Sequence, residues 1–334
     1  MKPKNIVVLM GGISTEREVS LRSGKAVAKA LENAGFNVTC IDVKDEKVEE
    51  LDTMDIDVAF IALHGYFGED GGIQQLLESK GIPYTGSGIH ASKLAMDKLA
   101  TKKCFIEAGL KTPEYVVATD FQDFIEIQHE VNRLGLPVIL KPTRNGSSMG
   151  ISILKDIKHL QLGLEKAFEF GYELLIEQYI KGREFTVGIL NDTALPIIEI
   201  KTAAEFFNYE AKYKDDRTQY LIVEKIFDNE QTLSDNIPRS SSFLTHSLYK
   251  KVQTLALNAH KILGCRGFSR VDILMDAHNN FYLLEVNTIP GFTEKSLLPK
   301  AAKADGISFT ALCEKIVDLA FQNILVSADE STAN

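Results

Sequence analysis

Three side chains that carry oxygen atoms have a spacing that could hold a metal ion. Asp272 lies in an expected strand over residues 269–275, while Glu285 lies in, and Asn287 just after, a second expected strand over residues 281–286. Residues two apart on a strand point to the same face, so Glu285 and Asn287 face the same way. Carboxylate and amide oxygens suit Mg²⁺, which commonly bridges nucleotide phosphates. The spacing therefore predicts a magnesium site on a hairpin.

The alternative for this hairpin is an acidic edge in water, with Arg270 as the ionic partner of the carboxylates. Leu283, Leu284 and Val286 flank the acidic position and indicate that the hairpin is largely buried. Buried carboxylates require a cation or another positive partner. The metal interpretation is therefore favoured, and Arg270 is the candidate partner if no metal binds.

A lysine and a glycine-rich turn could bind phosphate. Lys141 ends an expected strand, and the turn Asn-Gly-Ser-Ser-Met-Gly follows at residues 145–150. Backbone N–H groups of such a turn can wrap phosphate oxygens, while the lysine supplies a positive charge. The order differs from the phosphate loop GxxxxGK[ST], because here the lysine precedes the glycines. An ordinary hairpin turn is the alternative.

Two further carboxylates could recognise a nucleoside. Glu177 and Glu184 stand on either side of the turn at Lys181-Gly182. Such residues can accept hydrogen bonds from an adenine amino group and from ribose hydroxyls. Surface salt bridges are the alternative interpretation.

Glycine-rich loops follow the first and third expected strands. Residues 11–20 contain Glu16, and residues 62–72 contain His64. Ligands of open α/β sheets bind beyond the carboxyl ends of the strands, so both loops are well placed. Glu16 could instead lie in the first turn of a helix capped by a neighbouring hydroxyl, and a lone histidine is often structural. The glycine spacing is not GxGxxG, which disfavours a dinucleotide site.

An alternation of strands and helices predicts the fold that positions these side chains. Short β-branched runs alternate with helical apolar spacing, a pattern typical of a parallel sheet. The expected N-terminal elements are strands 5–10, 36–43 and 57–63 and helices 20–34 and after Gly71. The fold class is therefore α/β, beginning with an open parallel domain over residues 1–96.

The rest of the chain alternates less regularly. The expected helices are 98–108, 122–134 and 243–263, and the expected strands are near Tyr115 and over 138–141, 151–154, 172–179, 184–190, 194–200, 269–275 and 281–286. Residues 203–242 are polar and charged with little periodicity, and their length suggests a lid. The last helix is expected to end near Leu325, with a frayed, disordered tail over residues 326–334.

The composition indicates a globular protein without polyanionic partners. The 334 residues are 45% hydrophobic, and 37 basic against 46 acidic residues give a net charge of −9. This charge disfavours nucleic acid and anionic membranes. The apolar run IVVLM near the N-terminus is too short for the core of a signal peptide, no apolar run reaches membrane-spanning length, and the four cysteines lack metal or disulfide spacing. We therefore expect a cytoplasmic protein with reduced cysteines.

Eight ordered motifs resemble the D-alanine–D-alanine ligases of the ATP-grasp superfamily. They lie between about Asn5 and Leu325 and read GGISTEREVSLRSG, ALHGYFGEDGGIQQLLE, YTGSG, MDK, LKPTRNGSSMGIS, EAKY, RVDIL and FYLLEVNTIPGFTEKSLLP. The resemblance implies a substrate domain over 1–96, a central ATP-grasp domain over 97–182 and a C-terminal ATP-grasp domain over 183–325. It also implies ATP-dependent joining of two D-alanines through a D-alanyl phosphate, giving D-alanyl-D-alanine, ADP and phosphate for peptidoglycan precursors.

The resemblance implies a nucleotide and metal site. Lys98, Lys141 and Lys212 would contact the ATP phosphates, Glu177 the adenine and Glu184 the ribose. The ligands of two Mg²⁺ ions, for which Mn²⁺ could substitute, would be Asp272, Glu285 and Asn287.

The first D-alanine has its own implied contacts. Glu16 would receive its ammonium group, and His64 would lie nearby. Ser147 and Tyr213 would join Glu16 in a hydrogen-bonded group that ties the lid over the site.

The second D-alanine and the transition state have further implied contacts. Ser296 and Leu297 would hold the carboxylate of the second substrate. Arg270 and the backbone N–H of Gly291 would stabilise the tetrahedral oxyanion, a role that requires donors fixed before the charge develops.

The resemblance leaves the acceptor open. Tyr213 stands where relatives that make a D-alanyl-D-lactate ester carry another residue, which favours the dipeptide. D-lactate or D-serine is the alternative acceptor, because Ser296 and Leu297 would hold any carboxylate. A regulatory nucleotide-binding module without catalysis is disfavoured because the metal ligands and Arg270 are all present. The resemblance also implies a homodimer, and the segment between Tyr213 and Arg270 is longer than is usual for a lid.

Overall fold

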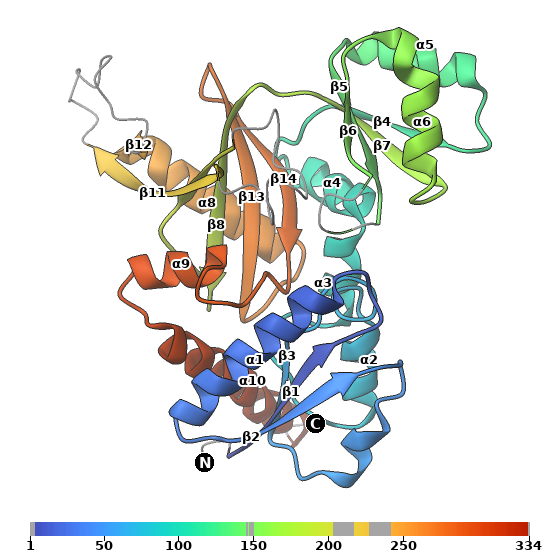
Figure 1. Cartoon of the computed structure of the whole chain (residues 1–334). Helices are drawn as coiled ribbons and strands as arrows, with labels where there is room; N and C mark the ends of the chain where they lie inside the picture. The colour runs from blue at the N-terminus through green and yellow to red at the C-terminus, as the bar shows by residue number, and fades with distance from the viewer. Residues whose placement is uncertain (1–3, 145, 147–149, 203–216, 227–241, 333–334) are drawn as a thin grey trace.

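Three β-sheets organise the described part of the chain. The computed structural model describes residues 4–144, 146, 150–202, 217–226 and 242–332, with side chains to residue 322. Figure 1 shows the N-terminal sheet and both chain termini at the bottom, the largest sheet above it, and a smaller sheet at the upper right.

The N-terminal sheet is parallel, as expected. Its strands have the order β2-β1-β3 and comprise β1 (Asn5–Gly11), β2 (Asn37–Val43) and β3 (Val58–Ile61). The first helices are α1 (Arg17–Asn33), η1 (Glu49–Thr53), α2 (Gly72–Ser79) and α3 (Ile89–Met96). Every residue of β3 is buried, in keeping with a parallel strand that is covered on both faces.

The last helix of the chain packs against this first sheet. α10 (Phe309–Thr332) contacts α1 and β3, and its Leu312 and Ile316 share a core with Ile6 and Val8. The expectation that the helix ends near Leu325 is wrong, because α10 continues to Thr332, while the expected disordered tail stays a prediction. No glycine or proline between these positions would stop a helix.

A four-stranded antiparallel sheet forms the smaller lobe. Its order is β4-β7-β5-β6, and the strands are β4 (Tyr115–Thr119), β7 (Glu173–Gln178), β5 (Val138–Pro142) and β6 (Ser152–Leu154). The helices of this part are α5 (Phe124–Leu134), η2 (Ile157–His159) and α6 (Leu160–Phe168), whereas α4 (Lys98–Glu107), which precedes them, contacts α3, α8 and β14. The pairing of β5 with β6 confirms the expected hairpin around residues 145–150.

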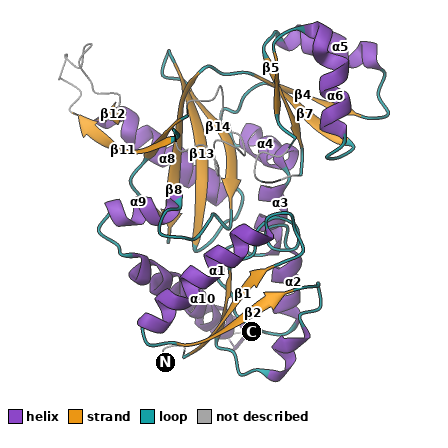
Figure 2. Cartoon of the chain, viewed as in Figure 1, coloured by secondary structure: helices purple, strands orange, loops and turns teal. Residues whose placement is uncertain are grey.

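The largest sheet carries the predicted metal hairpin. Its order is β12-β11-β10-β8-β13-β14, with β9 on β8, and its strands are β8 (Gly182–Leu190), β9 (Thr193–Ala194), β10 (Ile198–Lys201), β11 (Gln219–Ile226), β12 (Ser242–Thr245), β13 (Phe268–Asp276) and β14 (Phe281–Asn287). Two helices flank it: α8 (His246–Ile262) and α9 (Leu297–Ala304). Figure 2 shows α8 running beside β8 and β13, which it contacts.

Three details of this sheet correct the sequence-based boundaries. The strand expected over 194–200 is interrupted around Pro196, which cannot donate to a ladder. The helix expected from Phe243 begins at His246, because residues 242–245 pair with β11. β11 itself lies inside the expected lid, whereas lid residues 203–216 and 227–241 lie outside the described part.

An aromatic cluster joins the first sheet to the largest one. Phe292 is 1% exposed, and its ring meets Phe60 and Phe268 edge to face at centroid distances of 5.5 and 5.6 Å. Such pairs add about 0.5–1.5 kcal/mol each beyond their buried area. The cluster therefore fixes the loop after β14 against the N-terminal sheet.

Within the described residues, no helix has both the length and the apolar character needed to cross a membrane.

Candidate functional site

The hairpin of β13 and β14 presents four polar side chains on one face. Asp272 pairs with Glu285, and Arg270 pairs with Asn287. The Nδ2 atom of Asn287 lies 3.3 Å from Oδ2 of Asp272 and 3.4 Å from Oε1 of Glu285. The predicted convergence of the three oxygen-bearing side chains is confirmed.

Arg270 is the ionic partner of Asp272 in this structure. Its Nε and Nη2 atoms donate to the two oxygens of Asp272 at 3.0 and 2.7 Å, a bidentate arrangement that fixes both side chains. The hydroxyl of Thr186 on β8 donates to the same carboxylate at 2.6 Å. The partner proposed as the alternative to a metal is therefore present, beside the predicted metal ligands.

The chemistry of these donors fits a hard cation. Among the described residues, no group of three His, Cys, Asp or Glu side chains is arranged to hold a metal, so a metal bound by Asp272 and Glu285 would need a further donor such as Asn287. Its amide presents nitrogen to both carboxylates, and a half-turn of the amide would present oxygen instead. The three side chains would then offer only oxygen atoms, the donors that Mg²⁺ prefers.

Lys141 and Glu177 form a buried ion pair in the smaller lobe. Glu177 pairs with Ile139 on β5, which places it on the same face as Lys141 two residues later. Lys141 Nζ lies 2.6 Å from Oε2 of Glu177, and Lys102 Nζ lies 3.2 Å from Oε1. Burial opposes ionisation of Glu177, but the two lysines outweigh it and hold its pKa below the usual range.

Lys102 is a site residue that the sequence did not reveal. It is 1% exposed, although it is one of several lysines in the helical segment after Lys98. Its contact with Glu177 joins positions 75 residues apart (177 − 102). No local sequence pattern predicts such a contact.

The two N-terminal loops meet the glycine-rich turn at Glu16. A β-carbon added to Gly65 would lie 2.9 Å from Oε2 of Glu16, and one added to Gly146 would lie 2.8 Å from the same atom. Only glycine therefore allows this approach without moving the carboxylate. The structure thus places the predicted ammonium-binding residue beside the turn that follows Lys141.

Glu69 is a second residue that sequence reasoning missed. Its carboxylate accepts a 2.7 Å hydrogen bond from the N–H of Gly65. Loss of water and the nearby charge of Glu16 raise the pKa of Glu69 to about 8, against that hydrogen bond and the opposing charge of Arg270. Its place in the loop of His64 was the only signal in the sequence.

His64 is buried in a hydrogen-bonded network that connects the loop after β3 with the loop after β14. Its Nε2 atom lies 3.2 Å from the Ser23 hydroxyl, which accepts a 3.2 Å bond from the N–H of Phe292. Burial, together with the charge of Arg270, lowers the pKa of His64 to about 4, against a backbone hydrogen bond with Ile289. The imidazole is therefore neutral near pH 7, and both the structural and the functional interpretation of His64 stay open.

Gly291, Ser296 and Leu297 lie together after β14. A β-carbon on Gly291 would lie 3.2 Å from the Ser296 hydroxyl, which accepts a 3.1 Å bond from the N–H of Thr293. Leu297 is the first residue of α9, so its N–H is one of the helix-terminal donors that favour an anion.

The remaining predicted site residues are located here by the element that carries each of them. Lys98 begins α4, and its N–H donates to the Thr143 carbonyl at 2.9 Å, which brings this helix end beside the strand of Lys141. Glu184 lies near the start of β8. Ser147, Lys212 and Tyr213 lie outside the described residues.

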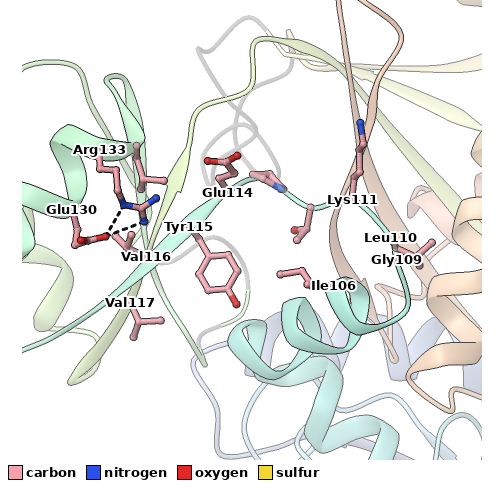
Figure 3. Close-up of a pocket in the computed structure, with 13 residues that line it drawn as sticks. Ile106, Gly109, Leu110, Lys111, Glu114, Tyr115, Val116, Val117, Glu130 and Arg133 are labelled. Atoms are coloured by element: carbon pink, nitrogen blue, oxygen red, sulfur yellow. Dashed lines mark hydrogen bonds and ion pairs between the residues drawn. The ribbon is translucent and has the colours of Figure 1, made fainter.

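A hollow of about 910 Å³ lies where the chain passes from the end of α4 into β4. Figure 3 shows the Glu130–Arg133 ion pair at one side and the Tyr115 ring directed toward the helix that carries Ile106. Its walls include Lys111, but no residue assigned to the predicted chemistry is among its described lining residues. The hollow nevertheless borders the candidate site, because Thr112 and Pro113, which accept hydrogen bonds from Lys102, are among its lining residues.

Comparison with known proteins agrees with this geometry. The family model for the C-terminus of D-Ala-D-Ala ligases matches residues 104–318, and the model for the N-terminus matches residues 5–52 and 45–87. The chain belongs to the D-alanine–D-alanine ligase family. A relative named D-alanine–D-alanine ligase from Syntrophotalea carbinolica is 44% identical over 95% of this chain and 96% of its own length.

Solved structures in this family have the same fold. D-alanine–D-alanine ligase from Bacillus anthracis complexed with ATP aligns with a TM-score of 0.79 and 34% identity, over 96% of this chain and 98% of that one. The D-Ala:D-Ser ligase VanG from Enterococcus faecalis aligns at 0.77 and 29%, over 96% of this chain and 100% of that one. The expected α/β class with its ATP-grasp part is confirmed.

Proposed function

We propose that this protein joins two D-alanine molecules in an ATP-dependent reaction that yields D-alanyl-D-alanine, ADP and phosphate. The observation that carries the proposal is the cluster of Arg270, Asp272, Glu285 and Asn287 on one sheet face. Membership of the D-alanine–D-alanine ligase family gives this cluster its chemical context. A cytoplasmic location and a role in supplying peptidoglycan precursors follow from this activity.

The first step would form an acyl phosphate. A carboxylate oxygen of the first D-alanine attacks the γ-phosphorus of ATP, and ADP leaves. Glu16 would hold the ammonium group of this substrate, while Lys98 and Lys141 would neutralise phosphate oxygens. Positioning and charge neutralisation are the main tasks of a protein in phosphoryl transfer.

Asp272, Glu285 and Asn287 would hold Mg²⁺ during this step. We expect two ions, replaceable by Mn²⁺, that lower the repulsion between the carboxylate and the phosphates. The bidentate hydrogen bonds from Arg270 would hold the carboxylate of Asp272 in a fixed orientation toward the metal. Glu177 and Glu184 would bind the adenine and the ribose, and Lys212 would approach the γ-phosphate.

The second step would make the peptide bond. The amine of the second D-alanine attacks the acyl carbon, loses a proton and displaces phosphate. Ser296 and the start of α9 at Leu297 would hold its carboxylate. Arg270 and the N–H of Gly291 would stabilise the oxyanion of the tetrahedral intermediate. His64, Ser147 and Tyr213 would enclose the first substrate, and we expect the enzyme to act as a homodimer.

The test is phosphate release from ATP and Mg²⁺, followed by mass analysis of the product. D-alanine alone should release phosphate and give the dipeptide mass, while L-alanine should release none. Parallel reactions of D-alanine with D-serine or D-lactate report the choice of acceptor, because each mixed product has its own mass. Failure to release phosphate with any of these substrates would refute the proposal.

A further inference from the structure

We propose that Lys102 is a positioning residue for nucleotide binding, which holds Glu177 so that Lys141 is free to turn to a phosphate. The proposal rests on the proposed function, in which Lys141 binds ATP. Lys102 itself would touch no substrate atom. Its task would be to remain with the buried carboxylate when the other lysine leaves.

Each N–H donor of the Lys102 ammonium group has an acceptor. Nζ lies 3.2 Å from Oε1 of Glu177, 2.5 Å from Oγ1 of Thr112 and 3.0 Å from the carbonyl oxygen of Pro113. An ammonium group has three N–H donors, so these three acceptors satisfy it. The same atom lies 5.2 Å from the centre of the Tyr115 ring. Together these contacts oppose movement of the side chain.

Lys141 is held less tightly than Lys102. Its side chain is 12% exposed, against 1% for Lys102, and it takes the other oxygen of Glu177 at 2.6 Å. It ends a strand beside the glycine-rich turn, whereas Lys102 lies in the interior of α4. Lys141 can therefore leave Glu177 for a phosphate oxygen, while Lys102 cannot.

The charges explain why this second lysine is needed. Glu177 is 2% exposed, and a buried carboxylate without a positive partner is strongly disfavoured. If Lys102 were absent, Lys141 would be the only cation on Glu177 within the described part of the chain, and turning it to ATP would leave that buried charge without a described ionic partner. With Lys102 present, the carboxylate keeps one ion pair throughout.

Lys102 also connects the two sheets between which the nucleotide would bind. Phe105 on the same helix packs in the core of the largest sheet with Phe185 and Val187. Glu177 and Lys141 belong to the smaller sheet. The ion pair thus sets the position of an adenine-binding residue relative to the sheet that carries the metal ligands.

The first experiment compares Lys102→Met with Lys103→Met, an exposed lysine at the next position of the helix. Affinity for a non-hydrolysable ATP analogue with Mg²⁺ is measured by calorimetry on the full chain. Lys102→Met should weaken binding by about 10- to 100-fold, the range for losing a hydrogen bond between charged groups. Lys103→Met should bind as the wild type does. Equal affinity of both variants would overturn the proposal.

A double-mutant cycle separates this role from simple packing. In a Glu177→Gln background the carboxylate charge is gone, so adding Lys102→Met should change the affinity less than twofold. A packing role for Lys102 predicts the same loss in both backgrounds, because packing does not depend on the charge of Glu177. An equal loss in the two backgrounds would refute the positioning role.

A pH series tests the same role of Lys102 by removing its charge while the side chain stays in place. Burial, followed by the charge of Lys141, lowers the pKa of Lys102 to about 8, and Glu177 opposes this. Tyr115, whose pKa is raised by its own burial, stays neutral over this range. Wild-type affinity for the analogue should therefore fall between pH 7 and pH 9, while Lys102→Arg, which keeps its charge, should show a smaller fall. Identical pH curves would contradict the proposal, even if Lys102→Met does not fold.

These measurements do not depend on the ligation itself. If the analogue binds with the predicted dependence on Lys102 but D-alanine gives no product, the proposed function fails and the role of Lys102 stands. If the dipeptide forms but Lys102→Met binds the analogue normally, only the role of Lys102 fails.

Discussion

Arg270 acts on three other side chains of the candidate site. It holds Asp272 through two hydrogen bonds, and its charge also acts on His64 and Glu69. A lysine could supply the charge but not the planar pair of donors. Arg270 is therefore suited to the two proposed roles, which are to orient Asp272 as a metal ligand and to stabilise a developing oxyanion.

Replacing Arg270 tests this dual assignment. Arg270→Ala should lower kcat by at least about 100-fold, the usual cost of removing an oxyanion donor, and should spare nucleotide binding. Arg270→Lys should recover only part of the rate. Steady-state dipeptide formation gives kcat, and Arg133→Ala, which breaks a surface ion pair with Glu130, is the matched control. Near-normal turnover of Arg270→Ala would exclude it from the chemistry.

Replacing Glu285 tests the predicted metal site. Glu285→Gln keeps the shape but removes the charge, so the affinity for Mn²⁺ in the presence of the ATP analogue should fall about tenfold or more. Titration followed by electron paramagnetic resonance measures free Mn²⁺ directly. The control is Glu314→Gln, which changes a carboxylate on α10, outside the hairpin that carries the predicted metal ligands. Unaltered Mn²⁺ binding by Glu285→Gln would remove this residue from the ligand set.

Residue-level prediction from the sequence succeeded where the chemistry follows a local spacing. Glu285 and Asn287 are two apart on one strand, so their common face could be read directly. Lys102 and Glu69 were missed because their importance comes from burial and from partners on other elements. Burial of a single charged side chain depends on the tertiary structure and leaves no periodic signal.

At the scale of elements, the site depends on how closely three loops approach one another. The loop of Glu16 touches Gly65 from the loop after β3 and Gly146 from the turn after β5. Neither contact has room for a β-carbon beside the carboxylate. Close approach of backbone to a functional group is a common reason for glycine.

Gly146→Ala tests the approach of the glycine-rich turn. The new β-carbon would lie 2.8 Å from Oε2 of Glu16, so the carboxylate must move aside. The KM for D-alanine should rise severalfold, while binding of the ATP analogue changes less. Gly88→Ala is the control, because its nearest neighbour would lie at an ordinary 3.7 Å. An unchanged KM for D-alanine would show that Glu16 does not need this position.

The sequence predicted the long and regular elements better than the short ones. Strands β1 and β13 and helices α4 and α5 appear within a few residues of their expected bounds. Helices α3, α6 and α9 were not expected, because eight or nine residues give few apolar repeats, although the equally short α2 was expected after Gly71. β11 was hidden in a polar segment because its outer positions face water. The division into domains at residues 96 and 182 stays a prediction.

At the scale of the whole molecule, buried histidines couple folding to pH. Burial is the main cause that lowers the pKa of His260 to about 4, and its Nδ1 atom lies 2.7 Å from the Ser269 hydroxyl. The folded pKa of His260 lies below the ordinary value of about 6.5, so protonation of this histidine favours the unfolded state. Its effect on the free energy of unfolding is therefore small above pH 6.5, and the free energy of unfolding falls as the pH drops from 6.5 toward 4.

The free energy of unfolding should therefore fall between pH 7 and pH 5, with roughly 2 kcal/mol of the loss due to His260. His260→Gln, which cannot titrate, should show a loss smaller by about that amount. Urea unfolding at the two pH values measures both quantities, and His129→Gln, at an exposed position, should behave as the wild type. The same pH sensitivity in His260→Gln and wild type would contradict this assignment.

The most direct test of the proposed ligation follows one oxygen atom. D-alanine labelled with ¹⁸O in both carboxylate oxygens is incubated with ATP, Mg²⁺ and the full chain, and the released phosphate and the dipeptide are analysed by mass spectrometry. An acyl phosphate transfers one labelled oxygen to phosphate when the carbon–oxygen bond breaks, and the peptide carbonyl keeps the other. Phosphate carrying one ¹⁸O per peptide bond is the predicted result, and unlabelled phosphate formed with the dipeptide would contradict activation of the D-alanine carboxylate by the γ-phosphate.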